Sequence, residues 1–314
     1  MSLKFEFLLL FLILTILNIS AQKQPETEIQ RITTLDEIII YNKLSTRKLL
    51  HILQKDTTFY QAFVNSRKLE YEGYHHIELI DNENISATYN AHTEQLYKNN
   101  CRFIKYLSKE TTGKIINSSG KFNLTTPAVY SNIFLYKDTI CNEFHQSRFH
   151  SRSISKLKGI DKYKEQLRNL LFNPGAKIQG IPLMGEKLQI FDTSAFKYYN
   201  YSFEPTNYKG KSCYLFRIIA KNNLSSYQKG KIIIDEMNTW LDMNNFTILG
   251  RSYWVSYNAL VYSFKVHMQI EMTEYKGFVV PASMVYNGTW KVIFKPRETV
   301  RFNNNFLNYK EPQP

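Results

Sequence analysis

Residues 187–301 alternate apolar and polar side chains in short segments, and this pattern constrains the fold more than any other feature of the sequence. The segments are rich in aromatic and β-branched residues, which favour strands. Turn clusters at 207–211 and 274–277 interrupt them. Short alternating runs at regular spacing are typical of an antiparallel meander. We expect about seven strands here, at 196–203, 212–219, 229–235, 248–257, 260–274, 279–286 and 289–294.

Two prolines limit how these segments fit into a sheet. Pro281 lies inside the segment 279–286, and Pro296 follows the segment 289–294. Because proline has no N–H to donate to a neighbouring strand, we expect both residues at sheet edges, strand ends or bulges.

The first half of the chain mixes two periodicities. Between residues 21 and 62, leucine and isoleucine recur near 3.6-residue spacing, which predicts one or two amphipathic helices that 58–64 continues. Residues 69–79 alternate apolar and polar side chains before the polar cluster 81–84, which predicts a strand and a hairpin turn. Further strands are expected at 102–107, 112–116 and 128–136, and a short helix at 161–171.

The N-terminal residues have the pattern of a secretion signal. Lys4 gives a short basic start, residues 7–17 are apolar except for Thr15, and Ala21 occupies the position before cleavage. The apolar stretch is shorter than the roughly 20 residues that span a membrane. We expect cleavage after Ala21, with an uncleaved anchor as the alternative. The mature chain is then periplasmic or secreted and has no transmembrane helix.

The three cysteines restrict the chemistry of the chain. Cys101, Cys141 and Cys213 form no CxxC spacing, which argues against common zinc and thioredoxin-type sites. Two arrangements remain open. One is a disulfide with one cysteine left over, and the other is three buried thiols in a β core.

The chain is strongly basic, with a formal net charge of +13. Such a surface attracts anionic lipid head groups, acidic polysaccharides or nucleic acid, and an exported protein meets the first two more often. We therefore expect no nucleic acid partner. Residues 145–158 contain no acidic side chain, and they form either a contact with an anionic surface or a solvated loop.

Motifs for catalysis are absent from the sequence. His75 and His76 are adjacent, so in a strand they point to opposite faces and cannot easily share a metal ion. No GxSxG, HExxH or glycine-rich phosphate loop occurs. Asp235 and Glu236 are expected at a strand end and turn. We expect no catalytic residue, metal site or cofactor, and a binding protein in preference to an enzyme.

Aromatic and aliphatic side chains of the C-terminal half are the candidate ligand-binding residues. They line an apolar cavity under one interpretation and fill an ordinary core under the other. The candidates are Tyr201, Phe203, Phe216, Ile232, Ile234 and Trp254.

The layout from Phe196 onward is similar to that of a known superfamily. The stretches FKYYNYSFEPTNYKGKSCYLFRII, KGKIIIDEMNTWLDMNNFTILGRSYW and VYNGTWKV resemble the periplasmic lipoprotein-carrier and lipoprotein-receptor proteins. In those proteins a strand and an aromatic residue precede the next strand of the sheet. The corresponding parts of this sequence are 230–235, Trp240 and 248–253. The resemblance implies an open, curved antiparallel sheet that wraps a hydrophobic cavity closed by helices. No lipid-handling residue of that superfamily can be transferred to a position here.

These observations combine into one expectation. The fold is mainly β (α+β), a curved antiparallel sheet or half-barrel with a few helices. The function is an exported cell-envelope carrier or binding protein for a lipid, a lipoprotein or another apolar ligand. The alternatives are a structural protein that docks through its basic face on an anionic membrane surface or an envelope protein, and an envelope hydrolase. The expected parts are a signal peptide 1–21, a helical region 22–65, a first part of the sheet 66–144, a basic loop and short helix 145–186, and a β meander 187–314.

Overall fold

The computed structural model describes residues 53, 58–99, 101–141, 190–258, 262–292 and 296–312. The chain divides into two units, and all of these residues belong to the unit 33–314. The predicted signal peptide, the predicted helix 161–171 and the basic run 145–158 lie outside the described residues. The predicted domain boundaries therefore stay a prediction. None of the described helices is long and apolar enough to cross a membrane.

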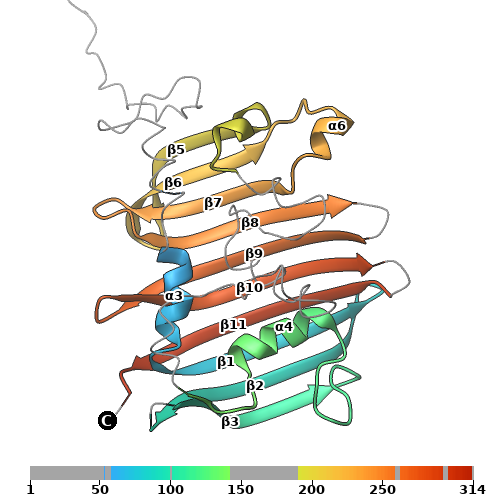
Figure 1. Ribbon diagram of the computed structural model, residues 1–314, viewed down its shortest axis with the longest axis vertical. Coiled ribbons are helices and arrows are strands. Elements are labelled where there is room, and N and C mark those ends of the chain that lie inside the picture. Colours follow the sequence, from blue (N-terminus) through green and yellow to red (C-terminus); the bar gives the residue numbers. More distant parts are fainter. Residues whose placement is uncertain are drawn as a thin grey trace, which may run out of the picture. The chain divides into compact units, whose positions relative to one another are not determined.

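Eleven strands form one sheet, and the predicted antiparallel architecture is confirmed (Figure 1). The strand order is β4-β3-β2-β1-β11-β10-β9-β8-β7-β6-β5, so two meanders meet where β1 pairs with β11. The strands are β1 (Glu70–Asp81), β2 (Asn84–Lys98), β3 (Cys101–Thr112), β4 (Ile140–Cys141), β5 (Tyr199–Tyr208), β6 (Lys211–Ala220), β7 (Ile234–Asp242), β8 (Ile248–Asn258), β9 (Tyr262–Tyr275), β10 (Phe278–Val292) and β11 (Glu298–Lys310).

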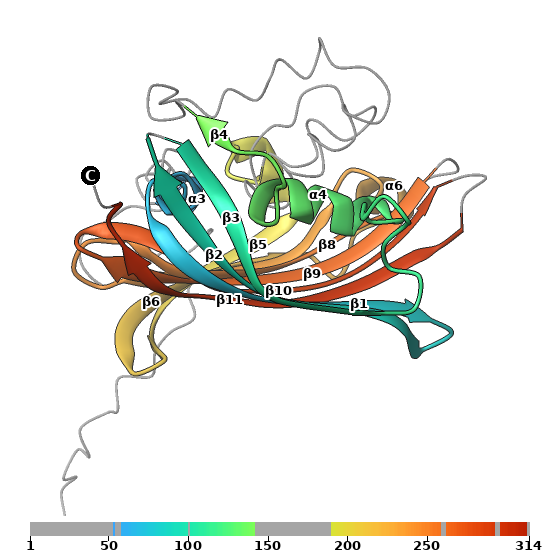
Figure 2. The same cartoon turned by 90° about the horizontal axis from the view of Figure 1, so that it is seen from below.

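The sheet is curved and unclosed, and its concave face carries the core (Figure 2). Strand register places one row of buried side chains across nine strands of this face, because every second residue of a strand points the same way. Burial of such a continuous apolar row is the main favourable term for folding. The row is Tyr201, Ile218, Met237, Tyr253, Met268, Tyr286, Phe302, Ile77 and Tyr89.

Two helices pack on the core. Helix α3 (Thr58–Ser66) confirms the predicted helical continuation, and its Asn65 amide donates to the Val279 carbonyl of β10 at 2.9 Å. Helix α4 (Thr125–Phe134) lies against β11, where the rings of Phe134 and Phe306 are 5.0 Å apart. The sequence prediction of a strand at 128–136 is therefore wrong.

The helical state of α4 has a physical reason. Its buried residues Thr126, Val129, Tyr130 and Phe134 follow helical spacing, which a short apolar run does not reveal by itself. Leu124 gives no side-chain cap at the N-terminus. The Glu298 carboxylate of β11 instead accepts a hydrogen bond from the Thr126 N–H at 3.2 Å, so a distant strand satisfies this helix end.

The predicted turns are confirmed. Lys209 and Gly210 have φ values of 52° and 83°, and Lys276 and Gly277 have 47° and 81°. Two successive positive φ values match the tight hairpin turns that suit the twist of antiparallel strands. Pro281 lies at a register shift of β10, the bulge position that proline requires, and Pro296 lies between β10 and β11.

Several predicted strand bounds need correction. The segment 229–235 is mostly not a strand, because the short helix α6 (Ser226–Lys229) precedes it and β7 begins at Ile234. A capping box between Ser225 and Gln228 explains this local helix. Asp235 and Glu236 consequently lie at the start of β7 and not in a turn.

Other bounds differ at strand ends. The segments 279–286 and 289–294 belong to the single strand β10 up to its end at Val292. The 3-10 helix η4 (Thr193–Lys197) precedes β5 and includes the first two residues of the predicted strand 196–203. The predicted strand 112–116 is not formed beyond Thr112. Gly113 has a φ of 61°, and an isolated bridge pairs Ile116 with Phe122. Strand β11 was not predicted.

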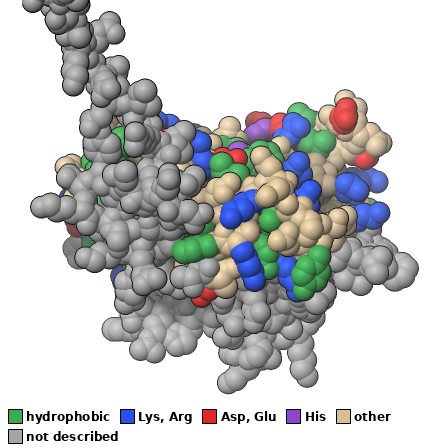
Figure 3. Space-filling view, turned by 90° about the horizontal axis from the view of Figure 1, so that it is seen from above, with side chains coloured by type: hydrophobic (Ala, Val, Ile, Leu, Met, Phe, Trp, Pro, Cys, Tyr) green, Lys and Arg blue, Asp and Glu red, His purple; other side chains and the backbone are tan. Residues whose placement is uncertain are grey.

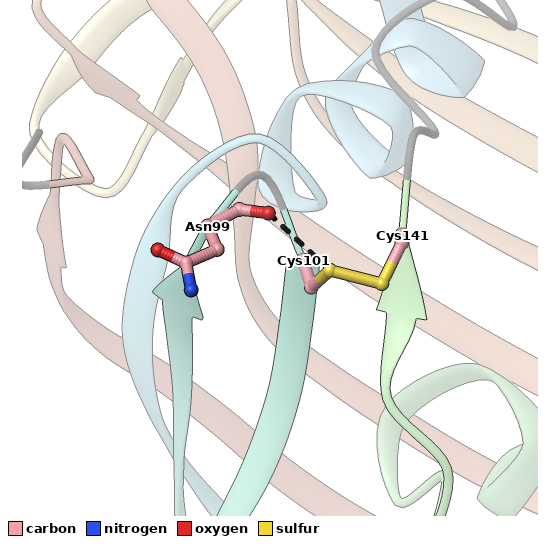
Figure 4. Close-up of a disulfide and its surroundings, with 3 residues drawn as sticks. All are labelled: Asn99, Cys101 and Cys141. Carbon is pink, nitrogen blue, oxygen red and sulfur yellow. Dashed lines mark hydrogen bonds between the residues drawn. A yellow bond between two sulfur atoms is a disulfide. The ribbon is translucent and has the colours of Figure 1, made fainter.

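One disulfide joins the edge strands β3 and β4 (Figure 4). Cys101 and Cys141 pair across the two strands, and Cys213 is buried and free. The arrangement of one pair and one leftover thiol is therefore the correct one of the two open alternatives. The cross-link holds the two-residue strand β4 against the end of the sheet.

Candidate functional site

A pocket of about 1130 Å³ opens at one end of the sheet, between the ends of strands β6 to β10 and the α6 segment. The chain leaves β6 at Ala220, passes through α6 and re-enters the sheet at Ile234. This excursion builds one wall of the pocket, and the β8, β9 and β10 ends build the other walls.

Apolar side chains make up part of the lining. Leu224 and Ile232 come from the two sides of α6 and are buried. Ile219, Tyr257 and Phe264 come from β6, β8 and β9. A surface that combines such groups with a few polar ones is typical of a small-molecule site.

Basic and neutral polar side chains form the rest of the lining. Lys221, Lys229, Lys265, Lys291 and Arg297 are its cations, and Asp235 is the single acidic side chain that the described residues contribute. Burial raises the pKa of Asp235, while the Ser256 hydroxyl and the charge of Lys265 oppose that rise. The pocket therefore has an apolar part and a net positive rim. Figure 3 shows Lys and Arg side chains beside hydrophobic ones on the face seen from the β5 end of the sheet.

The candidate ligand residues separate into three groups. Ile232 lines the pocket. Trp254 is exposed on the opposite face of β8 from Tyr253, its ring stacks on His267 at 4.2 Å, and the Lys265 ammonium lies 5.7 Å over it. Lys265 lines the pocket, but Trp254 itself is not among the lining residues.

The remaining candidates belong to the core away from the pocket. Tyr201, Phe216 and Ile234 are buried, and Phe203 is partly buried beside Tyr214. The Tyr201 hydroxyl donates to the Ile190 carbonyl at 2.6 Å, so this phenol already has a partner. None of these four side chains is among the lining residues, and their role in binding stays a prediction.

Sequence reasoning missed most of the lining. Leu224, Phe264 and the five basic residues come from strand ends and loops between residues 219 and 297. No local motif links them, because only strand pairing brings them together. The net positive charge of the sequence was the one available indication of a basic site.

The face of the sheet that carries Trp254 and Lys265 also carries polar pairs. Ser252 Oγ lies 3.0 Å from His267 Nε2, but Ser252 is in the middle of β8 and no described carboxylate is hydrogen-bonded to His267. His75 points into the core and His76 bonds to Asn90 and Glu78, so the adjacent histidines separate as predicted. The described residues hold no group of three metal-ligating side chains.

Comparisons with known proteins give a limited result. No family model matches the chain, and no curated protein matches it. A solved domain named for outer membrane lipoprotein sorting, from Vibrio parahaemolyticus, is 9% identical with a TM-score of 0.26, over 79% of this chain and 90% of that one. A DUF1329 family protein from Desulfovibrio piger is 9% identical with a TM-score of 0.23, over 81% and 91%.

The first of these structures is of the class that the C-terminal half resembles in sequence. TM-scores of this size carry no argument about what the chain binds.

Proposed function

We propose that the protein binds an amphiphilic molecule, an acyl or other lipid chain with an anionic head group, in the pocket beside α6. The chain would lie against Leu224, Ile232 and Phe264, and the head group would meet the basic rim. The observation that carries this proposal is that the described lining combines apolar side chains with five cations and one acidic residue.

The chemistry of the rim favours an anion over a neutral ligand. Lys265 lies on β9 and Lys291 on the neighbouring strand β10. Arg297 adds a guanidinium from the loop before β11. Guanidinium and ammonium groups bind carboxylate and phosphate oxygens through charge-assisted hydrogen bonds. An apolar chain gains free energy when it leaves water for the lined wall. A purely anionic or a purely apolar ligand would use only the basic rim or only the apolar wall, whereas an amphiphile uses both.

Two further features support a role outside the cytoplasm. The N-terminal residues have the pattern of a cleaved signal. The Cys101–Cys141 disulfide belongs to the type that persists in oxidising compartments. We therefore propose that the protein carries or holds its ligand in the cell envelope or in the secreted fraction.

Native mass spectrometry of the mature protein from its own source tests this proposal. We expect a co-purifying amphiphile that solvent extraction releases. The variant Asn258→Trp places a large ring at an exposed lining position and is expected to remove the bound mass. The variant Ile85→Trp changes a side chain that is 54% exposed in β2 and should keep it. A wild-type protein free of any ligand, or equal loading of both variants, would contradict the proposal.

A further inference from the structure

The most exposed large side chain among the exposed hydrophobics is on α6. Tyr227 is 74% exposed, and the Lys231 ammonium lies 5.0 Å from the centre of its ring. Lys229 and Lys231 follow Tyr227 in the chain by two and four residues and are also exposed. A ring that is this exposed, with a hydroxyl at its tip and an ammonium over its face, contributes little to the packing of the fold.

This tip is continuous with the basic rim of the pocket. Lys229 belongs to both, and Lys265, Lys291 and Arg297 are exposed on the same rim. Among the described residues, the acidic side chains nearby are fewer than the cations. Asp235 is half-buried in the pocket and Glu298 follows Arg297, so the net charge of this end stays positive.

We propose that this end of the protein docks on a membrane surface that contains anionic lipid, with Tyr227 at the level of the head groups. We call the docking surface the α6 tip, which consists of Tyr227, Lys229, Lys231, Lys265, Lys291 and Arg297. Tyrosine is enriched at membrane–water interfaces because its ring is apolar and its hydroxyl is wet. Clustered lysines and arginines are attracted to the negative potential of anionic lipids.

The exposed Tyr227 ring and the clustered cations together discriminate among anionic partners. A soluble anionic polymer would use the cations but gain nothing from a protruding phenol ring. A lipid surface uses both, since its interface offers phosphate groups and an apolar layer within a few ångströms. The pocket mouth would then face the membrane, the source or destination of an amphiphile. The docking goes beyond the pocket's proposed function and does not require that the pocket be occupied.

Co-sedimentation of the full mature chain with vesicles tests the docking. Vesicles of phosphatidylcholine alone are compared with vesicles that also contain phosphatidylglycerol, at low and high salt. We expect binding to the second kind only, weakened by salt. Each lysine near an anionic surface contributes about a fivefold change in affinity. The double variant Lys229→Glu with Lys231→Glu should therefore lose at least about 25-fold.

Matched variants separate docking from general charge. The double variant Lys98→Glu with Lys310→Glu makes the same charge change at exposed residues on the opposite strand ends, and it should retain most of the binding. Tyr227→Ser should weaken binding at unchanged charge. Asn258→Trp should bind vesicles at least as tightly as the wild type even where its pocket is blocked, because a further aromatic ring at this end favours the interface, so failure of the ligand proposal stays distinguishable.

The docking proposal is overturned if the protein does not bind phosphatidylglycerol vesicles. It is also overturned if the two charge variants lose binding equally, or if Tyr227→Ser binds like the wild type. Binding to a soluble anionic polysaccharide without binding to vesicles would also overturn it, and would assign the cations to a glycan.

Discussion

The Tyr130 hydroxyl of α4 lies 2.6 Å from Nδ1 of His75 on β1 and joins the helix to the sheet inside the core. On the other side of the ring, Nε2 of His75 lies 2.9 Å from Thr93 Oγ1, which itself lies 3.4 Å from the Gly73 carbonyl. If the Thr93 hydroxyl donates to that carbonyl, His75 must donate from Nε2 and accept from Tyr130 at Nδ1. The network thus holds a neutral imidazole in one tautomer.

Acid should weaken the fold through His75. Burial, with a smaller effect from His92, lowers the pKa of His75 to about 3. Between that value and the usual pKa of about 6.5 the unfolded chain binds more protons than the folded one, so stability falls as the pH falls. The loss is about 1.4 kcal/mol per pH unit in this window, and it is absent above it.

Urea unfolding at pH 7 and pH 5 measures this effect. The wild-type protein should lose about 2 kcal/mol more between the two conditions than His75→Gln, which carries no titrating ring. Equal losses in the two proteins would show that His75 is not neutral and buried in the native state.

The hydrogen bond from Tyr130 should contribute measurably to stability. Tyr130→Phe keeps the ring against Phe302 but leaves Nδ1 of His75 without its donor in the core. A buried acceptor without a partner costs about 1–3 kcal/mol. Thermal unfolding should show a lower midpoint for this variant, whereas Tyr227→Phe, at the exposed tip, should be neutral.

Asn304 should be a site where a substitution stabilises the protein. Its side chain is 0% exposed on the concave face, and neither amide atom has a hydrogen-bond partner among the described residues. Asn304→Leu has the same branching and removes two buried polar atoms that have no partner. We expect a higher unfolding midpoint, by an amount that corresponds to about 1–3 kcal/mol. A lower midpoint would mean that the amide has a partner in solution, such as a buried water.

Loss of the disulfide should mainly affect the β4 edge. The bridge closes a segment of 40 residues, and removal of such a link typically costs about 2–5 kcal/mol. The double variant Cys101→Ser with Cys141→Ser should unfold at lower urea concentration. Cys213→Ser serves as the control, since that thiol is not bonded to another cysteine. Equal unfolding midpoints for the wild-type protein and the double variant would contradict the cross-link.

Local sequence patterns predicted the meander because its strands carry their own signal. Residues 248–257 alternate, and the turns at Gly210 and Gly277 require the positive φ that glycine adopts easily. Strand β11 escaped prediction because Asn303, Asn304 and Asn305 disfavour strands. Its alternating buried residues Val300, Phe302 and Phe306 form a strand because β1 and β10 pair with it on both sides.

The pocket could not be predicted for a related reason. Ile232 was identified as an apolar residue, but Phe264, Lys291 and Arg297 meet it only through the pairing of β7 to β10. A net charge of +13 indicated an anionic partner without indicating where the cations converge. Which strands pair and which loops come together is determined in the folded chain, and local sequence patterns do not show it.

Titration of the mature protein with a fluorescent long-chain fatty acid, in parallel with the uncharged alcohol of the same chain, tests the central claim most directly. The account predicts saturable binding of both, with the acid about fivefold tighter. Lys265→Glu should remove the preference for the acid, and Ile232→Glu should remove the binding of both. Ile85→Glu, the matched apolar-to-acidic change at an exposed site, should bind like the wild type. Absence of saturable binding, or binding that Ile232→Glu and Asn258→Trp leave unchanged in folded protein, would contradict the assignment of the pocket.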